Sequence, residues 1–376
     1  MTVLAGAALA PALPDMTVAF QDVPNAEFLV RLVLTMPALF IALSAPFAGM
    51  LLDSLGRKPV LIVSLILYGL AGSSGFLLSS LFSILVGRAL LGVAVAGIIS
   101  GFTTLIGDHF TGAKLNQFMG YQGAAIGLGG MVYLLLSGVL ADIGWRFPFL
   151  IYLSAFLVLP GVLFAVDETR SQAGDARQAS LANSGSLPIR TIGLIYTTAF
   201  VGMFIFFVFP VQLPFYLIAQ VGASNSQVGL ALSLQTLPAI IIALQYHRLK
   251  ARLSFQGIFG LFFLTVGINH LIVGLTTSYA LIMGGLLIGG LGLGLFPPNL
   301  NVWIASITPT ALRGRAIGGL SAALFVGQFI TPIITQPMVA RAGMSGTFGI
   351  IGGVSLLLAV AFIGMAISQR KLRSNS

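Results

Sequence analysis

Long apolar runs, separated by short polar turns, constrain this chain more than any other feature. Most of the runs match the roughly 20 residues that a helix needs to cross the hydrocarbon core of a bilayer. Inside lipid only helices and closed barrels satisfy their backbone hydrogen bonds, and these runs are too long and too uniformly apolar for barrel strands. Charged residues make up only 7% of the chain, too few to cover the surface of a soluble protein. The sequence therefore predicts an all-α membrane protein.

The polar turns divide the chain into twelve predicted transmembrane helices. They lie near residues 2–20, 28–52, 59–80, 82–106, 116–140, 147–166, 191–218, 227–246, 255–275, 279–305, 315–339 and 345–367. One longer polar stretch, 167–190, has the Ser, Ala and Gly content of a flexible linker. We predict an N-terminal six-helix bundle at 1–166, a cytoplasmic linker at 167–190 and a C-terminal six-helix bundle at 191–376. Similar Lys/Arg and Gly spacing after the fourth and tenth helices favours two pseudo-symmetric halves.

The distribution of cations predicts how the chain sits in the membrane. Most of the 18 Lys and Arg residues fall in one set of alternate turns, so the positive-inside rule predicts both termini in the cytoplasm and a multi-pass protein of the cytoplasmic membrane. The net charge of +9 suits the anionic inner leaflet of the bilayer, and we expect no nucleic-acid partner. A secretory signal would begin with a cationic segment, and none precedes the first run. We therefore expect a trimmed or late-starting N-terminus rather than a cleaved signal.

The segment GMLLDSLGRK, Gly49–Lys58, follows the second predicted helix. It resembles the loop between the second and third helices of major facilitator superfamily transporters, except that Ser54 stands where an arginine is common. The resemblance implies a secondary transporter with the major facilitator fold. It also implies that this loop latches the cytoplasmic gate, with the aspartate contacting the eleventh helix near Arg315, where a helix N-terminus attracts a carboxylate. The gate residues are then Gly49, Asp53, Gly56, Arg57 and Lys58.

Proton coupling is predicted to lie in the first half of the chain. All nine Asp and Glu residues precede residue 176. Asp15 and Arg88 lie at similar depth within predicted helices, where ionisable residues pair or serve transport. An arginine lowers the pKa of a neighbouring carboxylate, so separating the two would promote protonation. We predict that Asp15 and Arg88 couple protons; Asp15 could instead be interfacial or form a structural bridge with Arg31.

Two further patterns resemble proton-coupled members of the same superfamily. The run RALLGVAVAG, Arg88–Gly97, is similar to their fourth-helix motif, in which the arginine is linked to proton transfer, although Leu91 replaces the usual glutamine. Residues 123–146 resemble the fifth-helix motif of drug–proton antiporters, but Tyr133 and Leu134 occupy the place of its Gly-Pro kink. The resemblance implies the drug–proton antiporter branch. Close helix packing would also account for the glycines of this segment.

Amides and aromatic rings dominate the polar content of the second half. These groups suit an amphipathic or weakly polar substrate better than a strongly anionic one. Each amide could instead bridge helices, and His270, on a peripheral helix, is predicted to be structural. The predicted substrate cavity is lined by Tyr133, Phe206, Phe209, Gln212, Gln235, Asn299, Asn301 and Gln328.

Together these features predict a monomeric secondary transporter that exports a small amphipathic compound or drug in exchange for protons, by alternating access. The alternative is a sugar or metabolite transporter that is not coupled to protons. A membrane-embedded enzyme is disfavoured because the sequence has no HExxH motif, nucleophile–base pair or ATP-binding loop. A sensor that keeps the fold but does not transport is also compatible with the sequence. We expect a small-molecule substrate, protons and the lipid bilayer as partners, with no cofactor and no metal.

Overall fold

The computed structural model describes residues 4–110, 112–165, 188–309 and 312–374, and this part of the chain is helical throughout, with connecting turns. Its segments run in the order α1 (Leu4–Ala7), η1 (Ala10–Ala12), α2 (Leu13–Ala19), α3 (Ala26–Leu55), α4 (Arg57–Ser73), η2 (Ser74–Phe76), α5 (Leu81–His109), α6 (Gly112–Ile143), η3 (Phe147–Ser154), α7 (Ala155–Ala165), α9 (Ile189–Tyr216), η4 (Leu217–Val221), α10 (Asn225–Leu234), α11 (Thr236–Leu244), α12 (Tyr246–Lys250), α13 (Phe255–Leu275), α14 (Tyr279–Ile307) and α15 (Arg313–Ser374).

The observed helices lie where the apolar runs predict them. Ten helices of the described residues are long and apolar enough to cross a membrane. One of them, α15, contains both of the last two predicted spans and bends at Gly343, whose φ of 71° and ψ of 175° are not helical. The first predicted span is present as the broken series α1, η1 and α2. The all-α prediction of about twelve membrane helices is therefore confirmed. Most of the predicted linker lies outside the described residues.

Proline explains where two of the predicted spans are interrupted. A proline ring clashes with the carbonyl four residues earlier and lacks the N–H that would bond to it. Helix α1 ends at Ala7, four residues before Pro11, and α10 ends at Leu234, four residues before Pro238. Helices α3 and α9 continue through their prolines, so a proline alone does not fix where a helix ends in this protein.

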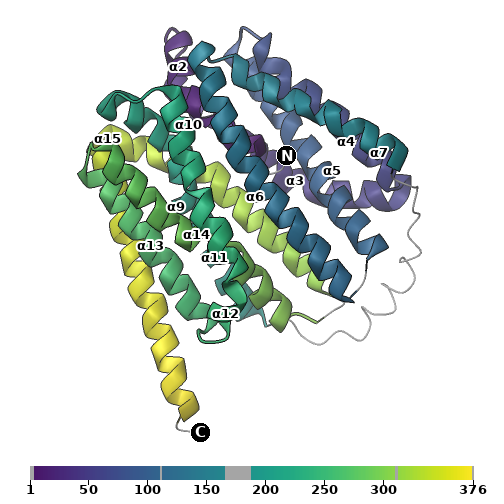
Figure 1. The fold of residues 1–376 in the computed structure, drawn as a ribbon, viewed down its shortest axis with the longest axis vertical. Helices are drawn as coiled ribbons and strands as arrows, with labels where there is room; N and C mark the ends of the chain where they lie inside the picture. The colour runs from purple at the N-terminus through teal and green to yellow at the C-terminus, as the bar shows by residue number, and fades with distance from the viewer. Residues whose placement is uncertain (1–3, 111, 166–187, 310–311, 375–376) are drawn as a thin grey trace.

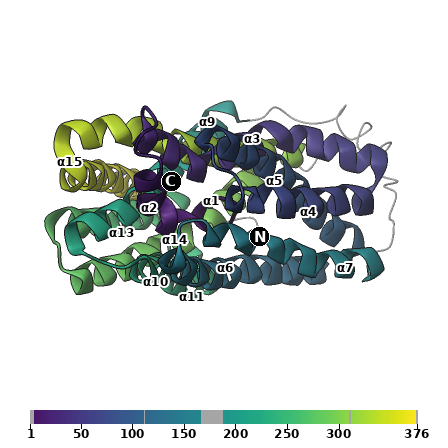
Figure 2. The ribbon, with the colours of Figure 1, turned by 90° about the horizontal axis from the view of Figure 1, so that it is seen from above.

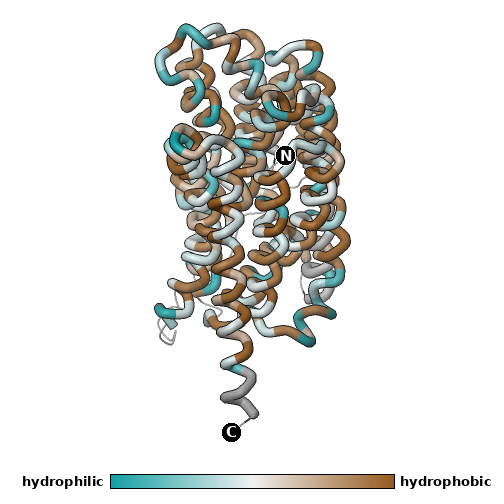
Figure 3. The backbone as a smooth tube through the Cα atoms, turned by 90° about the vertical axis from the view of Figure 1, so that its left-hand side faces the viewer, coloured by the Kyte–Doolittle hydropathy of each residue, from teal (hydrophilic) through white to brown (hydrophobic). Residues whose placement is uncertain are grey.

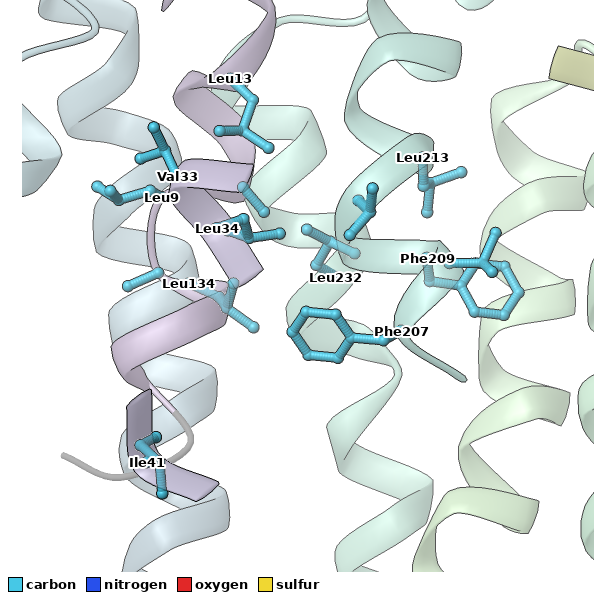
Figure 4. Close-up of a cluster of buried hydrophobic side chains, with 14 of the residues drawn as sticks. Leu9, Leu13, Val33, Leu34, Ile41, Leu134, Phe207, Phe209, Leu213 and Leu232 are labelled. Atoms are coloured by element: carbon cyan, nitrogen blue, oxygen red, sulfur yellow. The ribbon is translucent and has the colours of Figure 1, made fainter. Parts of the chain in front are cut away.

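The helices form two groups that lie side by side. Helices α3, α4, α5 and α7 occupy one side of the molecule and α9, α13 and α15 the other, as the views along two directions show (Figure 1, Figure 2). Apolar residues fill most of the length of the helices, and many hydrophilic residues lie in the turns at either end (Figure 3). One continuous core of buried side chains joins the two groups, and part of it, around Leu34, Leu134 and Leu232, is shown in Figure 4.

The bundle has two ends that carry different polar groups. One end holds Asp15 of α2, the turn between α2 and α3, the last turn of α6 and the start of α10. The other holds Asp53 at the end of α3, the start of α4, the last turn of α5, and α12 (Figure 1). We call these the Asp15 end and the Asp53 end. The hydrogen bonds that connect the two groups of helices lie at the Asp15 end.

Candidate functional site

Asp15 connects the two halves of the molecule. It lies in the first turn of α2, and its Oδ2 accepts a hydrogen bond of 2.7 Å from Asn225 Nδ2. Asn225 is the first residue of α10, and the same Nδ2 also donates to the carbonyl of Ala141 at 3.3 Å. A carboxylate of the first half is therefore held by a neutral amide of the second half.

Arg88 has other partners. It is buried in α5, its Nε donates to the carbonyl of Val33 at 3.0 Å, and its guanidinium lies 5.0 Å from the ring centroid of Tyr152. These contacts place Arg88 within the first half, against α3 and η3, whereas the hydrogen bond of Asp15 leads to α10. Among the described contacts, the structure therefore gives the two predicted coupling residues different partners.

Arg31, which the sequence analysis offered only as an alternative structural partner of Asp15, has contacts with both halves. Its side chain is 1% exposed, its Nε donates to Gln212 Oε1 at 3.1 Å, and its Cζ lies 3.9 Å from the ring centroid of Phe215. Its Nη1 donates to the carbonyl of Glu27 at 2.8 Å and lies 3.6 Å from the Glu27 carboxylate. The alternative bridge from Asp15 to Arg31 is replaced by a pair within α3. The polar turn before α3 signals a helix start but does not reveal which residues face the second half.

A third contact between the halves joins α6 to the first residues of α10. Asp142 Oδ1 accepts from the backbone N–H of Asn225 at 3.0 Å, and its Oδ2 accepts from the backbone N–H of Ser226 at 3.2 Å and from the Ser226 hydroxyl. The first N–H groups of a helix lack internal partners and carry partial positive charge. Asp142 thus caps a helix of the other half.

The predicted gate residues lie together at the Asp53 end. Gly56 separates α3 from α4 with a φ of 93°, a backbone conformation that favours glycine. The buried Arg57 donates from Nε to Asp108 Oδ2 at 2.9 Å and from Nη1 to the carbonyl of Leu52 at 2.8 Å. Asp53 is 61% exposed, with a carboxylate oxygen 3.9 Å from Arg57 Nη1. This ion pair lies within the first half, while the implied contact of Asp53 is with the eleventh helix.

Gly49 and Lys58 flank this group. A Cβ added at Gly49 would meet no atom within 4 Å, and Lys58, in the first turn of α4, is half-buried.

Of the predicted cavity residues, Tyr133 lies in the first half, and two glutamines of the second half lie against the first half. Gln212 joins Arg31 to Thr335, to whose Oγ1 its Nε2 donates at 2.8 Å. Gln328 lies against the first segment, since a Cβ added at Gly6 would be 2.6 Å from its Nε2. Tyr133 lies in the first half and donates to Ser154 Oγ at 2.7 Å.

Phe209 and Asn299, two predicted cavity residues, have described partners inside the second half. Phe209 is buried with its ring centroid 4.2 Å from that of His270, and it points away from Phe207 and Leu34 (Figure 4). Asn299 Nδ2 donates to the carbonyl of Phe255 at 3.0 Å, and its Oδ1 accepts from the Tyr246 hydroxyl at 3.1 Å. These contacts pack both residues against other parts of the second half.

The remaining predicted cavity residues vary in exposure. Gln235 is buried at the break between α10 and α11, Asn301 is exposed, and Phe206 is half-buried. His270 is fully buried, with Nδ1 2.8 Å from the carbonyl of Val266, as a packing role requires. Among the described residues no cluster of three His, Cys, Asp or Glu side chains could hold a metal ion.

The structure thus consists of two groups of membrane helices joined by polar contacts at the Asp15 end. Residues 1–222 and 194–375 match the Major Facilitator Superfamily. The chain therefore belongs to this superfamily and is a multi-pass membrane protein.

Similar proteins support the same assignment. The inner membrane transport protein YnfM of Escherichia coli (strain K12) is 30% identical over 114 residues, or 30% of this chain and 27% of that protein. The multidrug resistance protein MdtG of Proteus mirabilis (strain HI4320) is 27% identical over 355 residues, or 89% of this chain and 85% of that protein. Seven curated relatives, YnfM included, align over only 20% to 42% of their own length.

A solved structure shows the same fold. The crystal structure of a D-xylose-proton symporter superposes with a TM-score of 0.75 over 95% of this chain and 93% of that one, at 16% sequence identity. The major facilitator fold predicted from the sequence is therefore confirmed.

Proposed function

We propose that this protein exports a small amphipathic compound from the cytoplasm in exchange for protons, by alternating access. The proposal places it in the cytoplasmic membrane as a monomer, with both termini in the cytoplasm, the Asp15 end outside and the Asp53 end inside. Asp15 carries the coupled proton, Arg88 supports it within the first half, and the Gly49–Lys58 loop gates the inner side. The similarity to the multidrug resistance protein MdtG supports the choice of substrate class.

The hydrogen bond from Asn225 Nδ2 to Asp15 Oδ2 carries this proposal. An ionised carboxylate accepts a charge-assisted hydrogen bond, which is stronger than the bond that the neutral acid would accept. Ionised Asp15 therefore favours contact between the halves at the outer side. That closed outer side belongs to the form that receives substrate from the cytoplasm. A proton arriving from outside weakens the contact and favours the form that releases substrate.

The first test measures proton movement with the protein in liposomes that contain a pH-sensitive dye. Lipophilic cations, neutral antibiotics and sugars are added in turn to wild type, Asp15→Asn and Asp22→Asn. Asp22 is the matched control, since its side chain is exposed at the same end. We expect at least one lipophilic compound to drive proton flux in wild type and Asp22→Asn, and the flux to fall by about tenfold or more in Asp15→Asn.

Two other outcomes would contradict the proposal. Substrate movement without proton flux, at a rate that Asp15→Asn leaves unchanged, would reject antiport. It would identify the alternative, a sugar or metabolite transporter that is not coupled to protons. Binding of a compound without movement would identify a sensor that has kept the fold.

A further inference from the structure

We propose that Glu27 is a second proton-accepting residue, and that it acts through Arg31 to close the Asp15 end. This inference deepens the proposed function and relies on its assignment of the Asp15 end to the outside. It rests on a cluster that joins three helices, namely Glu27 and Arg31 of α3, Gln212 and Phe215 of α9, and Thr335 and Gln336 of α15.

Arg31 is a buried cation, so its positive charge must be balanced by neighbouring groups. Its guanidinium is almost completely buried, and two of its partners, Gln212 and Phe215, belong to the second half. A buried cation is costly unless it is paired and hydrogen-bonded. The only carboxylate within ion-pair distance of Arg31 among the described residues is that of Glu27, at 3.6 Å.

Glu27 is the part of the cluster that solvent reaches. Its side chain is 65% exposed, so protons from the outer solution have direct access to it. Its Oε2 also accepts a hydrogen bond of 3.1 Å from Gln336 Nε2. The same carboxylate therefore balances the buried cation and contacts the second half.

Gln212 connects the two contacts on the second half. Its Oε1 accepts from Arg31, while its Nε2 donates to Thr335 Oγ1 at 2.8 Å. Thr335 precedes Gln336, the partner of Glu27, on α15. When the halves separate here, Arg31 loses Gln212 and Phe215, and Glu27 loses Gln336.

Protonation of Glu27 acts against this closed arrangement. The added proton removes the negative charge beside the guanidinium, so Arg31 becomes a buried cation without a counter-charge. Separation of the halves then hydrates Arg31 and relieves the cost. Ionised Glu27 therefore favours a closed Asp15 end, and acid on the outer side favours an open one.

Other charged groups near this end act separately. Asp15 and Asp22 lie on α2 and in the following turn, and Asp142 lies at the end of α6. Helices α9 and α15 contribute no carboxylate, and Arg341 is the charged residue of α15 closest in sequence to Gln336. Asp15 and Asp142 are held by neutral groups of α10, so Glu27 alone among these carboxylates makes a described ion pair with a buried arginine.

The test measures the distance between the halves as a function of pH, without any substrate. The natural chain has no cysteine, so spin labels can be attached at Val18→Cys and Leu275→Cys, two exposed positions at the Asp15 end. Distance distributions are recorded at pH 8 and pH 4. We expect wild type to move toward longer distances in acid. Glu27→Gln mimics the protonated residue and should already show the long distances at pH 8.

Two further variants separate the role of Arg31 from general damage. Arg31→Gln removes the buried cation, so ionisation of Glu27 no longer matters, and the double variant with Glu27→Gln should match Arg31→Gln alone. Asp22→Asn should respond to pH like wild type. A Glu27→Gln protein that keeps the full pH response of wild type would overturn the proposal.

The outcome is independent of the flux assay. If Asp15→Asn abolishes proton flux while Glu27→Gln leaves the distance response unchanged, only the role of Glu27 fails. If wild type carries no protons but Glu27→Gln removes the distance response, proton-driven export fails and the pair remains as a pH-sensitive closure.

Discussion

Arg31 and Arg57 are both buried cations, but they connect different parts of the molecule. The partners of Arg57 all lie in the first half, with Asp108 Oδ2 at 2.9 Å and Asp53 Oδ1 at 3.9 Å. The partners of Arg31 belong to both halves. A change at Arg57 should therefore affect the stability of one half, whereas a change at Arg31 should affect the contact between the halves.

Substitutions at the two partners of Arg57 should have different effects. Asp108→Asn removes the charge of the closer partner and leaves the buried guanidinium with the exposed carboxylate of Asp53 at 3.9 Å, so we expect a loss of about 1–3 kcal/mol in stability. Asp53→Asn removes an exposed partner, and surface pairs contribute about 0–1 kcal/mol. Its expected effect is slower turnover with nearly unchanged substrate binding, as the gate role requires.

Thermal unfolding in detergent and transport in liposomes distinguish these effects. Asp108→Asn should lower the unfolding temperature more than Asp53→Asn does. Unchanged transport by Asp53→Asn would reject the gate role of this residue.

The sequence predicted the grouping of residues whose position depends on local spacing. The grouping of Gly56 and Arg57 follows from a motif of ten residues, and the structure brings them together with Asp53. The sequence did not predict the contact of Arg31 with Gln212, because the two residues are 181 positions apart. Nothing in the local sequence of α3 shows which residues face the second half. Phe209 lies on α9 together with Gln212 and Phe215, which contact the first half. Only the packing in the structure shows that the ring of Phe209 faces His270.

At the scale of elements, α6 and α10 approach closely through two glycines. A Cβ added at Gly229 would lie 2.6 Å from the carbonyl oxygen of Leu134, and one added at Gly138 would lie 2.7 Å from that of Asn225. Both atoms belong to backbone, so neither contact can be relieved by a side-chain rotation. The two glycines thus allow the last turns of α6 to reach the residues that begin α10.

Gly229→Ala should therefore push α6 and α10 apart and weaken the closed Asp15 end. Gly130→Ala is the matched control, because it lies on α6, the other helix of this pair, and a Cβ there would meet no atom within 4 Å. We expect the spin-label distance between positions 18 and 275 to lengthen in Gly229→Ala and to remain at the wild-type value in Gly130→Ala. Equal distances in the two variants would show that this contact does not control closure.

The positions of the elements were more predictable than their continuity. Apolar length predicted 279–305 for a helix observed at Tyr279–Ile307, because lipid exposure requires an uninterrupted apolar run. The sequence did not predict the break at Gln235, since Pro238 is followed by an apolar run like any other. Prolines inside α3 and α9 leave those helices intact, so the effect of a proline depends on contacts that the sequence does not contain.

For the whole molecule, the two halves carry complementary kinds of polar group. Asp15, Glu27 and Asp142 of the first half contact Asn225, Gln336 and Ser226 of the second half. Every partner on the second half is neutral, in agreement with the absence of Asp and Glu after residue 175. Ionised carboxylates can therefore close the Asp15 end without facing like charges.

Asn225→Asp should reverse this arrangement. A new carboxylate would face Asp15 and lie beside Asp142, and like charges across an interface oppose association. We expect the spin-label distance to lengthen at pH 8 and to recover partly at pH 5, where protonation reduces the repulsion. Gln220→Asp adds the same charge at an exposed position of η4 and should keep the wild-type distance. A closed Asn225→Asp protein at pH 8 would contradict this account of the interface.

The bend at Gly343 ties the last two membrane passes into one continuous piece of helix. Only this residue departs from helical geometry between Arg313 and Ser374, and its φ of 71° suits glycine. A longer loop between the two passes could change shape when the pass that carries Thr335 and Gln336 moves. Here only one residue connects them. Since only this residue separates the two arms, we expect a displacement of the arm that carries Thr335 and Gln336 to move the arm that leads to the C-terminus as well.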